Sequence, residues 1–196
     1  LEGKIAKLVS STEKPAHAIG RAVREALALP SSRLSDADAV EMLMDPAQNK
    51  MLGESLSLLT LGKASRALEL VHLTFQRKIS HTADSQAQRH RMTPGVRPVL
   101  WTQIVPGAPD FVLPVIFLEP DAAQARAIYD REMRAVFDDV ARLHDAGVSP
   151  EIWQYLLPNA VPVRYTETGS LLDQHHKWTT RLCYNAQEEI WRASMD

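Results

Sequence analysis

The sequence predicts a single domain that mixes helices with a few extended segments. Several stretches place apolar side chains at the three-to-four-residue spacing of an amphipathic helix, and others alternate polar and apolar residues as strands do. The chain has 196 residues, of which 45% are hydrophobic and 23% are charged. A chain of this length and composition buries a sizeable core, and we expect residues 1–196 to form one domain.

The first 60 residues are expected to be helical. Residues 15–29 lie between prolines and repeat apolar side chains at helical spacing, which is typical of a surface helix. Ser35 precedes a second helical stretch, where its hydroxyl would cap the first turn. Residues 51–71 are predicted to form one or two apolar helices that break near Gly62.

The middle of the chain alternates between extended and helical patterns. Residues 72–79 are predicted to form a strand, and residues 80–91 a short helix whose first residue, a serine, would cap it. Turn-forming residues 92–98 follow. Two apolar runs, 99–105 and 111–118, are predicted to be strands or extended segments.

The clearest helix is predicted over residues 121–146. Apolar side chains repeat on one face, while arginine and aspartate share the other. Gly147 is expected to end this helix as a C-cap. A short helix over 151–157, an extended piece over 161–165 and one or two helices over 170–194 complete the expected elements.

Composition and charge argue against several classes of protein. The chain has 22 basic and 24 acidic residues, so no general basic surface for duplex nucleic acid is expected. No apolar run is long enough to span a membrane and no signal peptide opens the sequence, so we expect a cytoplasmic protein. The single cysteine, Cys183, excludes an internal disulfide and is expected to be a buried thiol. Because the sequence begins with Leu1 rather than Met, we expect a piece of a longer protein.

The densest polar cluster lies in residues 86–91. Arg89 and Arg91 flank His90, and a Pro-Gly turn follows three residues later. Guanidinium groups match phosphate oxygens in bidentate geometry, so this cluster is a candidate phosphate or nucleotide site. The alternative is a solvated helix end that carries ordinary ion pairs.

A second polar cluster runs from Gln174 to Arg181. Its adjacent histidines, His175 and His176, would point to different faces of a helix and are not expected to share a metal ion. We therefore predict no metal site. The tryptophans are expected in the core or at an interface: Trp101, Trp153, Trp178 and Trp191.

The string QAQRHR, which ends with Arg91, resembles the signature of the flavin-dependent thymidylate synthases, the ThyX family. The preceding segment HLTFQRKISHTADS keeps the spacing of that family from Phe75 through Ser80 to Gln86. Downstream, the stretch AGVSPEIWQYLLP and the tail AQEEI are similar to the family as well. The resemblance covers roughly residues 50–194.

The resemblance implies a fold, an activity and partners. The expected fold is α+β, with helices packed around a twisted, mainly antiparallel sheet. Residues 1–49 would be a helical extension, and residues 50–196 the family-like core. The family makes dTMP from dUMP with FAD as the cofactor and with NADPH and methylenetetrahydrofolate as co-substrates. Its members are tetramers whose active sites combine residues from more than one subunit, so dUMP or a related nucleotide and further copies or a second domain are the implied partners.

The resemblance also assigns roles to individual residues. Arg89, His90 and Arg91 would bind the flavin, and Arg89 would also bind the nucleotide. Gln86 would face the nucleotide. Arg181 would lie near the uracil ring as the catalytic residue, where a fixed cation polarises a ring carbonyl.

Several family positions carry other residues. The signature serine, the acid two residues before it and the arginine two residues after it fall on Val99, Arg97 and Trp101. An arginine that holds the nucleotide falls on Gln154, and an Asn-x-Arg pair that holds the flavin falls on Ser170 and Leu172. Arg97 would replace only part of the lost phosphate contacts.

These departures favour a degenerate ThyX-like domain, the non-catalytic or site-sharing half of a duplicated protein. One alternative is a self-contained active thymidylate synthase variant, which requires a different pocket built from Arg97, Trp101 and His176. A second alternative is a module that binds a nucleotide or single-stranded nucleic acid through the basic stretch 89–97 near Trp101. The net charge of -2 counts against this last reading.

Overall fold

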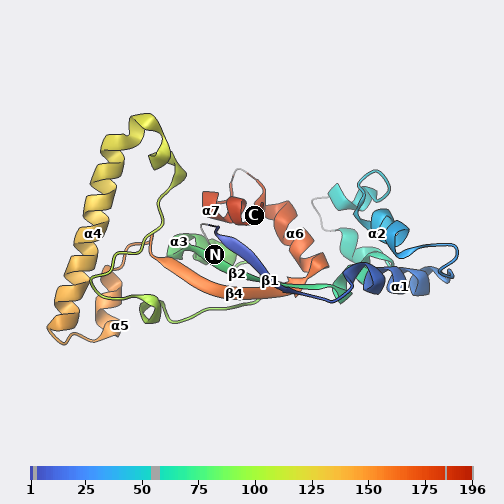
Figure 1. The fold of residues 1–196 in the computed structure, drawn as a ribbon, viewed down its shortest axis with the longest axis horizontal. Coiled ribbons are helices and arrows are strands. Elements are labelled where there is room, and N and C mark those ends of the chain that lie inside the picture. Colours follow the sequence, from blue (N-terminus) through green and yellow to red (C-terminus); the bar gives the residue numbers. More distant parts are fainter. Residues whose placement is uncertain (2–3, 54–57, 184, 196) are drawn as a thin grey trace.

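A four-stranded antiparallel sheet lies at the centre of the described residues (Figure 1). The computed structural model describes residues 1, 4–53, 58–183 and 185–195. The strands follow the order β1–β2–β4–β3: β1 (Ala6–Ser11), β2 (His72–Ser80), β3 (Gly95–Val96) and β4 (Pro162–Ser170). Helices pack on this sheet, which confirms the α+β class.

Strands β2 and β4 are the two central strands of the sheet. They pair along their whole length, from His72 opposite Ser170 to Ser80 opposite Pro162. The strands predicted over 72–79 and 161–165 are therefore confirmed, and the second continues to residue 170. This pairing places Arg77 opposite Tyr165 and fixes which side chains of both strands share a face.

The expectation of helix throughout the first 60 residues is wrong for β1. Residues 6–11 pair with β2 at the edge of the sheet, with a register shift between Leu8 and Ser10. All β1 side chains after Ala6 are exposed, so the strand shows no buried alternation that its sequence could reveal. Residues 6–11 are therefore a strand because they pair with β2, and not because of a local sequence pattern.

Helices α1 (Pro15–Leu27) and α2 (Asp36–Met44) confirm the two predicted N-terminal helices. Ser35 caps α2 as expected, and Asp38 completes a capping box. The helices predicted over 51–71 are instead short 3-10 helices: η1 (Lys50–Gly53), η2 (Leu58–Leu61) and η3 (Ser65–Leu70). Residues 54–57 lie outside the described residues. These elements share an apolar core with Leu172.

One face of the sheet is covered by α3 (His81–Ala87), α6 (Leu171–Arg181) and α7 (Glu188–Ala193) (Figure 1). Ser80 caps α3 as the sequence predicts. Apolar side chains of α3 and α7 pack with Ile79, Val163 and Tyr165 of the sheet. This layer is important because it carries both polar clusters found in the sequence.

The apolar runs 99–105 and 111–118 do not join the sheet, so the prediction of strands there is wrong. They contain the 3-10 helices η4 (Leu100–Gln103) and η5 (Val115–Leu118), and η6 (Pro120–Ala122) follows. Pro98 and Pro106 flank the first run and Pro114 lies within the second, and a proline lacks the N–H group that a central strand needs. Outside η4, η5 and η6, residues 99–122 form no helix or strand.

The long helix α4 (Ala123–Asp145) confirms the clearest sequence prediction. Gly147 follows it with a φ of 78°, a left-handed conformation that suits glycine. The short helix predicted next appears as α5 (Pro150–Trp153) and η7 (Gln154–Leu156). Only Phe137 and Val140 of α4 are buried, and Figure 1 shows α4 standing at the opposite end of the molecule from α1 and α2. No described helix is long and apolar enough to cross a membrane.

Candidate functional site

The first polar cluster lies where α3 ends against the end of α6 and the start of α7. Helix α7 holds α3 at both ends. The Glu189 carboxylate accepts hydrogen bonds from the backbone N–H and the hydroxyl of Ser80, both at 2.5 Å. The side-chain Oε1 of Gln86 accepts a bond from the backbone N–H of Gln187 at 3.0 Å. The AQEEI tail therefore fixes the helix that leads into the Arg89–Arg91 cluster.

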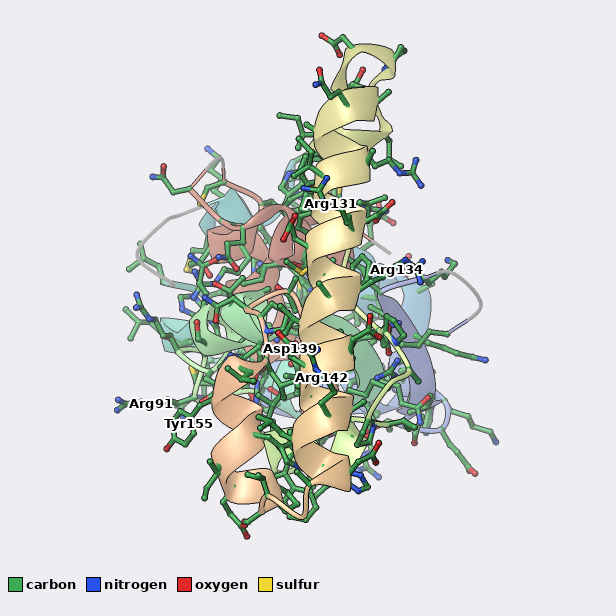
Figure 2. The ribbon with its side chains drawn as sticks, turned by 90° about the vertical axis from the view of Figure 1, so that its left-hand side faces the viewer. Arg91, Arg131, Arg134, Asp139, Arg142 and Tyr155 are labelled. Carbon is green, nitrogen blue, oxygen red and sulfur yellow. The ribbon has the colours of Figure 1, made fainter. Side chains whose placement is uncertain are left out.

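Arg181 joins the two polar clusters of the sequence. Its Nε donates a hydrogen bond to Nε2 of His90, and its Nη2 donates to the carbonyl oxygen of Gln86 at 3.3 Å. Gln86, His90 and Arg181 are therefore in one network, although 91 to 95 residues separate Arg181 from its partners. Arg89 and Arg91 are exposed, and Figure 2 shows Arg91 extending away from the ribbon.

The surroundings of His90 favour the neutral ring. Partial burial, followed by the positive charges of Arg181 and Lys177, lowers the pKa of His90 to about 4. Glu167 acts in the opposite direction, with a smaller effect. The ring of His176 lies 6.3 Å from the His90 ring, in an edge-to-face arrangement. At neutral pH, His90 is therefore an uncharged group in a cationic cluster.

One turn before Arg181 on α6, Lys177 joins Glu167 of β4 and Arg77 of β2 in a buried ionic trio. Lys177 Nζ lies 2.6 Å from both carboxylate oxygens of Glu167, and Arg77 Nε lies 2.7 Å from one of them. The side chains of all three are 4% exposed or less. Burial, and then the charge of Arg77, lower the pKa of Lys177 to about 8. Glu167 thus faces two cations, and the trio carries a net positive charge when Lys177 is protonated.

Arg77 and Glu167 are functional candidates that the sequence does not single out. Arg77 lies in a predicted strand, whereas Glu167 lies in the part of β4 beyond the predicted range 161–165. Only the pairing of β2 with β4 places Arg77 beside the Glu167 carboxylate, which Lys177 of α6 also binds. A charged residue at an inward-facing position of a strand was the available signal. Neither inward face could be assigned before the pairing was known.

A model of the thymidylate synthase complementing protein family matches residues 7–194. The chain belongs to this family. Among solved structures, the chain is similar to the UMP/dUMP methylase PolB from Streptomyces cacaoi bound with 5-Br dUMP, with a TM-score of 0.66 and 20% sequence identity. The alignment covers 97% of this chain and 86% of PolB. No curated protein matches the sequence significantly.

The thymidylate synthase complementing family match includes the N-terminal segment that the sequence analysis treated as an extension. It begins at residue 7, within β1, and therefore covers α1 and α2 as well. Strand β1 completes the sheet beside β2.

Arg97, which stands at an acidic position of the family signature, points inward. Its Nε donates to the buried carboxylate of Asp84 at 2.7 Å, and its guanidinium lies 4.3 Å from the centre of the Tyr165 ring. Asp84 also accepts a bond from Gln88 at 2.8 Å. Arg97 is therefore committed to an internal ion pair and a cation–π contact, and does not replace a lost phosphate contact.

The two positions that the resemblance assigns to flavin binding have structural roles in this chain. Ser170 is the N-cap of α6, where its hydroxyl accepts a bond from the Asp173 N–H at 3.1 Å. Leu172 is 3% exposed and lies in the apolar core. Neither residue offers a charged or free polar group to a flavin at these two positions.

The other altered positions also supply no anion anchor. Val99 is 60% exposed and apolar. Trp101 is half-buried, and the Gln154 amide donates to the carbonyl oxygen of Glu151 at 3.2 Å. Arg89 and Arg91 are exposed, and their positive charges are therefore accessible to an anion.

Two further expectations concern metals and the thiol. Among the described residues, no group of three His, Cys, Asp or Glu side chains is placed to hold a metal ion. Cys183 is exposed at the end of α6, so the expectation of a buried thiol is wrong. The residue follows the last turn of α6 and lies outside both described cores.

Of the tryptophans, Trp153 is buried, whereas Trp191 is 39% exposed.

Proposed function

We propose that this chain binds dUMP or a related uridine nucleotide as a degenerate, site-sharing member of the thymidylate synthase complementing family. Arg89, Arg91 and the Arg181–His90–Gln86 network form its contribution to the nucleotide site. Arg181 supplies the cation near the base, and the exposed arginines supply charge for the phosphate. A second, non-identical ThyX-like domain supplies the groups that this chain lacks.

The observation that carries this proposal is the bond between Arg181 and His90. Two segments that are far apart in the sequence, each similar to the family, meet in one cluster next to two exposed arginines. An ordinary solvated helix end would not require a half-buried arginine from another helix. The arrangement concentrates positive charge at one place on a chain whose net charge is -2.

The altered positions support sharing of the site. Leu172 lies in the core, Ser170 caps a helix and Arg97 is held by Asp84. These residues cannot be turned toward a ligand without breaking packing or a buried ion pair. The flavin chemistry of the family therefore needs residues from elsewhere, and NADPH and methylenetetrahydrofolate would be used only by the complete assembly.

The long helix α4 supports association with further copies. Most of its 23 residues are exposed, and Ile128 of α4 and the neighbouring Ile116 and Leu118 are each at least 46% exposed. Association would remove this apolar surface from water, which favours a tetramer or a paired domain. We place the protein in the cytoplasm on the basis of its family.

Two measurements on the purified chain test the proposal. Equilibrium dialysis with labelled dUMP should show saturable binding. Release of tritium from [5-³H]dUMP, in the presence of FAD, NADPH and methylenetetrahydrofolate, should not exceed background. Absence of dUMP binding would contradict nucleotide recognition, and tritium release by this chain alone would contradict a shared site and support a self-contained enzyme.

Arg89 provides the variant for this test. Loss of one charged hydrogen bond costs about 1.5–3 kcal/mol, so Arg89→Gln should weaken dUMP binding by about 10- to 100-fold. Arg131→Gln is the matched control, because Arg131 is an exposed arginine on α4 that pairs with Glu132. Equal affinities for the two variants would mean that Arg89 is ordinary surface.

A further inference from the structure

We propose that Arg181 fixes His90 as a neutral imidazole with its proton on Nδ1, so that His90 presents a permanent hydrogen-bond donor to the ligand. The ligand would supply an acceptor atom, a carbonyl or phosphate oxygen. The identity of that ligand rests on the proposed function, whereas the protonation state of the ring is a property of the free chain.

The direction of the Arg181–His90 bond carries the argument. A guanidinium group has only donors, and Arg181 directs its Nε–H at Nε2 of His90. Nε2 must therefore offer its lone pair, and the proton of the neutral ring must be on Nδ1. The second bond of Arg181, to the Gln86 carbonyl oxygen, holds the guanidinium in this orientation.

Protonation of His90 would destroy this arrangement. A proton on Nε2 would place two donors against each other and two positive charges in contact. The charges that face the ring come from Arg181, Lys177 and His176, all of which disfavour the charged form, while Glu167 favours it. The sum of burial and these charges keeps the pKa of His90 near 4.

The buried trio fixes the position of this pair. Lys177 lies one turn before Arg181 on α6, so both side chains project from the same face of the helix. Glu167 of β4, which also pairs with Arg77 of β2, holds Lys177 against the sheet. The trio thus sets the depth and rotation of α6, and with them the position of the Arg181 guanidinium.

The proposed tautomer restricts what His90 does for a ligand. A histidine with both nitrogens free can exchange donor and acceptor roles by moving its proton, but Nε2 is engaged here. His90 also remains neutral where a general base would begin to titrate. It is a positioning residue that selects for an acceptor, between two arginines that attract negative charge.

Nitrogen-15 NMR of the histidine-labelled chain tests the tautomer without any ligand. The His90 signals, assigned by their loss in His90→Gln, should show a protonated Nδ1 and an unprotonated Nε2. They should remain unchanged from pH 7 to about pH 5, because the pKa of His90 is lowered to about 4. A proton on Nε2, or titration of His90 near its ordinary pKa of 6.5, would overturn the proposal.

An Arg181→Gln variant adds a readout that a purely structural role would not move. Without the guanidinium, His90 should gain a mixed tautomer population and its pKa should rise toward 6.5. Arg131→Gln, in the exposed face of α4, should leave both unchanged. A His90 spectrum that is the same in the chain and in Arg181→Gln would contradict the assigned role of Arg181.

A pair of His90 variants separates the two ring nitrogens. The Asn amide reaches the position of Nδ1, whereas the Gln amide reaches the position of Nε2. If Nδ1–H contacts the nucleotide, His90→Asn should retain dUMP binding to within about three-fold of the unaltered chain, and His90→Gln should lose about ten-fold or more. The reverse order would overturn the donor role. If the unaltered chain does not bind dUMP, the proposed function fails, and the NMR spectrum of the free chain still decides the tautomer.

Discussion

Replacing Glu167 with glutamine tests the buried trio that lies beneath the site. Glu167 is the shared counter-ion of Arg77 and Lys177, at 2.6–2.7 Å, and its side chain is 1% exposed. Glutamine preserves the shape of the side chain but removes its negative charge. The substitution therefore leaves two buried cations next to each other without a counter-ion.

The expected cost follows from burial. Removing one partner of a buried ion pair destabilises a protein by about 3–5 kcal/mol, because the remaining charge is neither paired nor solvated. For a chain of this size each kcal/mol corresponds to about 2–4 °C in melting temperature, so Tm should fall by about 6–20 °C. Deprotonation of Lys177, whose pKa is already lowered to about 8, would relieve part of this cost.

Urea and thermal unfolding, followed by circular dichroism, measure the effect. The matched control is Glu132→Gln, which removes an exposed carboxylate paired with Arg131 and should change stability by less than about 0.5 kcal/mol. Adding Lys177→Met to Glu167→Gln removes one of the two cations left without a counter-ion, and should restore part of the lost stability. If Glu167→Gln unfolds at the same temperature as Glu132→Gln, the trio does not contribute as described.

Two further predictions concern stability. Ser35→Ala removes the hydroxyl that accepts a hydrogen bond from the Asp38 N–H at 3.1 Å. It should reduce the free energy of unfolding, measured by urea titration, by about 1 kcal/mol. Ser85→Ala is the control and should have a smaller effect, because Ser85 is exposed and caps no helix. The pKa of His90 in the folded chain, about 4, lies below its ordinary value of 6.5. Between pH 4 and pH 6.5, His90 therefore binds a proton in the unfolded chain but not in the folded chain. The contribution of His90 is therefore complete above about pH 6.5 and is lost as the pH falls toward 4, with a maximum of about 3 kcal/mol that solvent screening of the half-buried ring reduces to about half. Unfolding measured from pH 7 to pH 4 should show a shallower decline for His90→Asn, and identical slopes would contradict the assigned pKa.

Local signals in the sequence were sufficient for elements with a clear period or cap. The 3.6-residue pattern of α4 and the serine caps of α2 and α3 are local properties, and the structure confirms them. Strand β1 carries no such signal, because its side chains after Ala6 are exposed on both faces. The apolar runs around η4 and η5 misled the prediction because hydrophobicity alone does not distinguish strands from proline-rich irregular segments.

In the candidate site, too, some residues could be identified from the sequence and others only from tertiary contacts. Motif similarity selected Arg89, His90, Arg91, Gln86 and Arg181, and the structure brings Gln86, His90 and Arg181 into one network. The inward turn of Arg97 depends on Asp84, thirteen residues away, and on Tyr165 in β4. The Arg77–Glu167–Lys177 trio depends on the pairing of β2 with β4. Contacts of this kind follow from tertiary structure, and single-sequence reasoning does not reach them.

The central claim is that Arg181, held against His90, recognises a uridine nucleotide. Calorimetric titration of dUMP into the chain and into Arg181→Gln and Arg131→Gln tests it most directly. We expect saturable binding that Arg131→Gln leaves unchanged and that Arg181→Gln weakens by at least about ten-fold, the equivalent of one charged hydrogen bond. Binding of equal strength in all three proteins would contradict it.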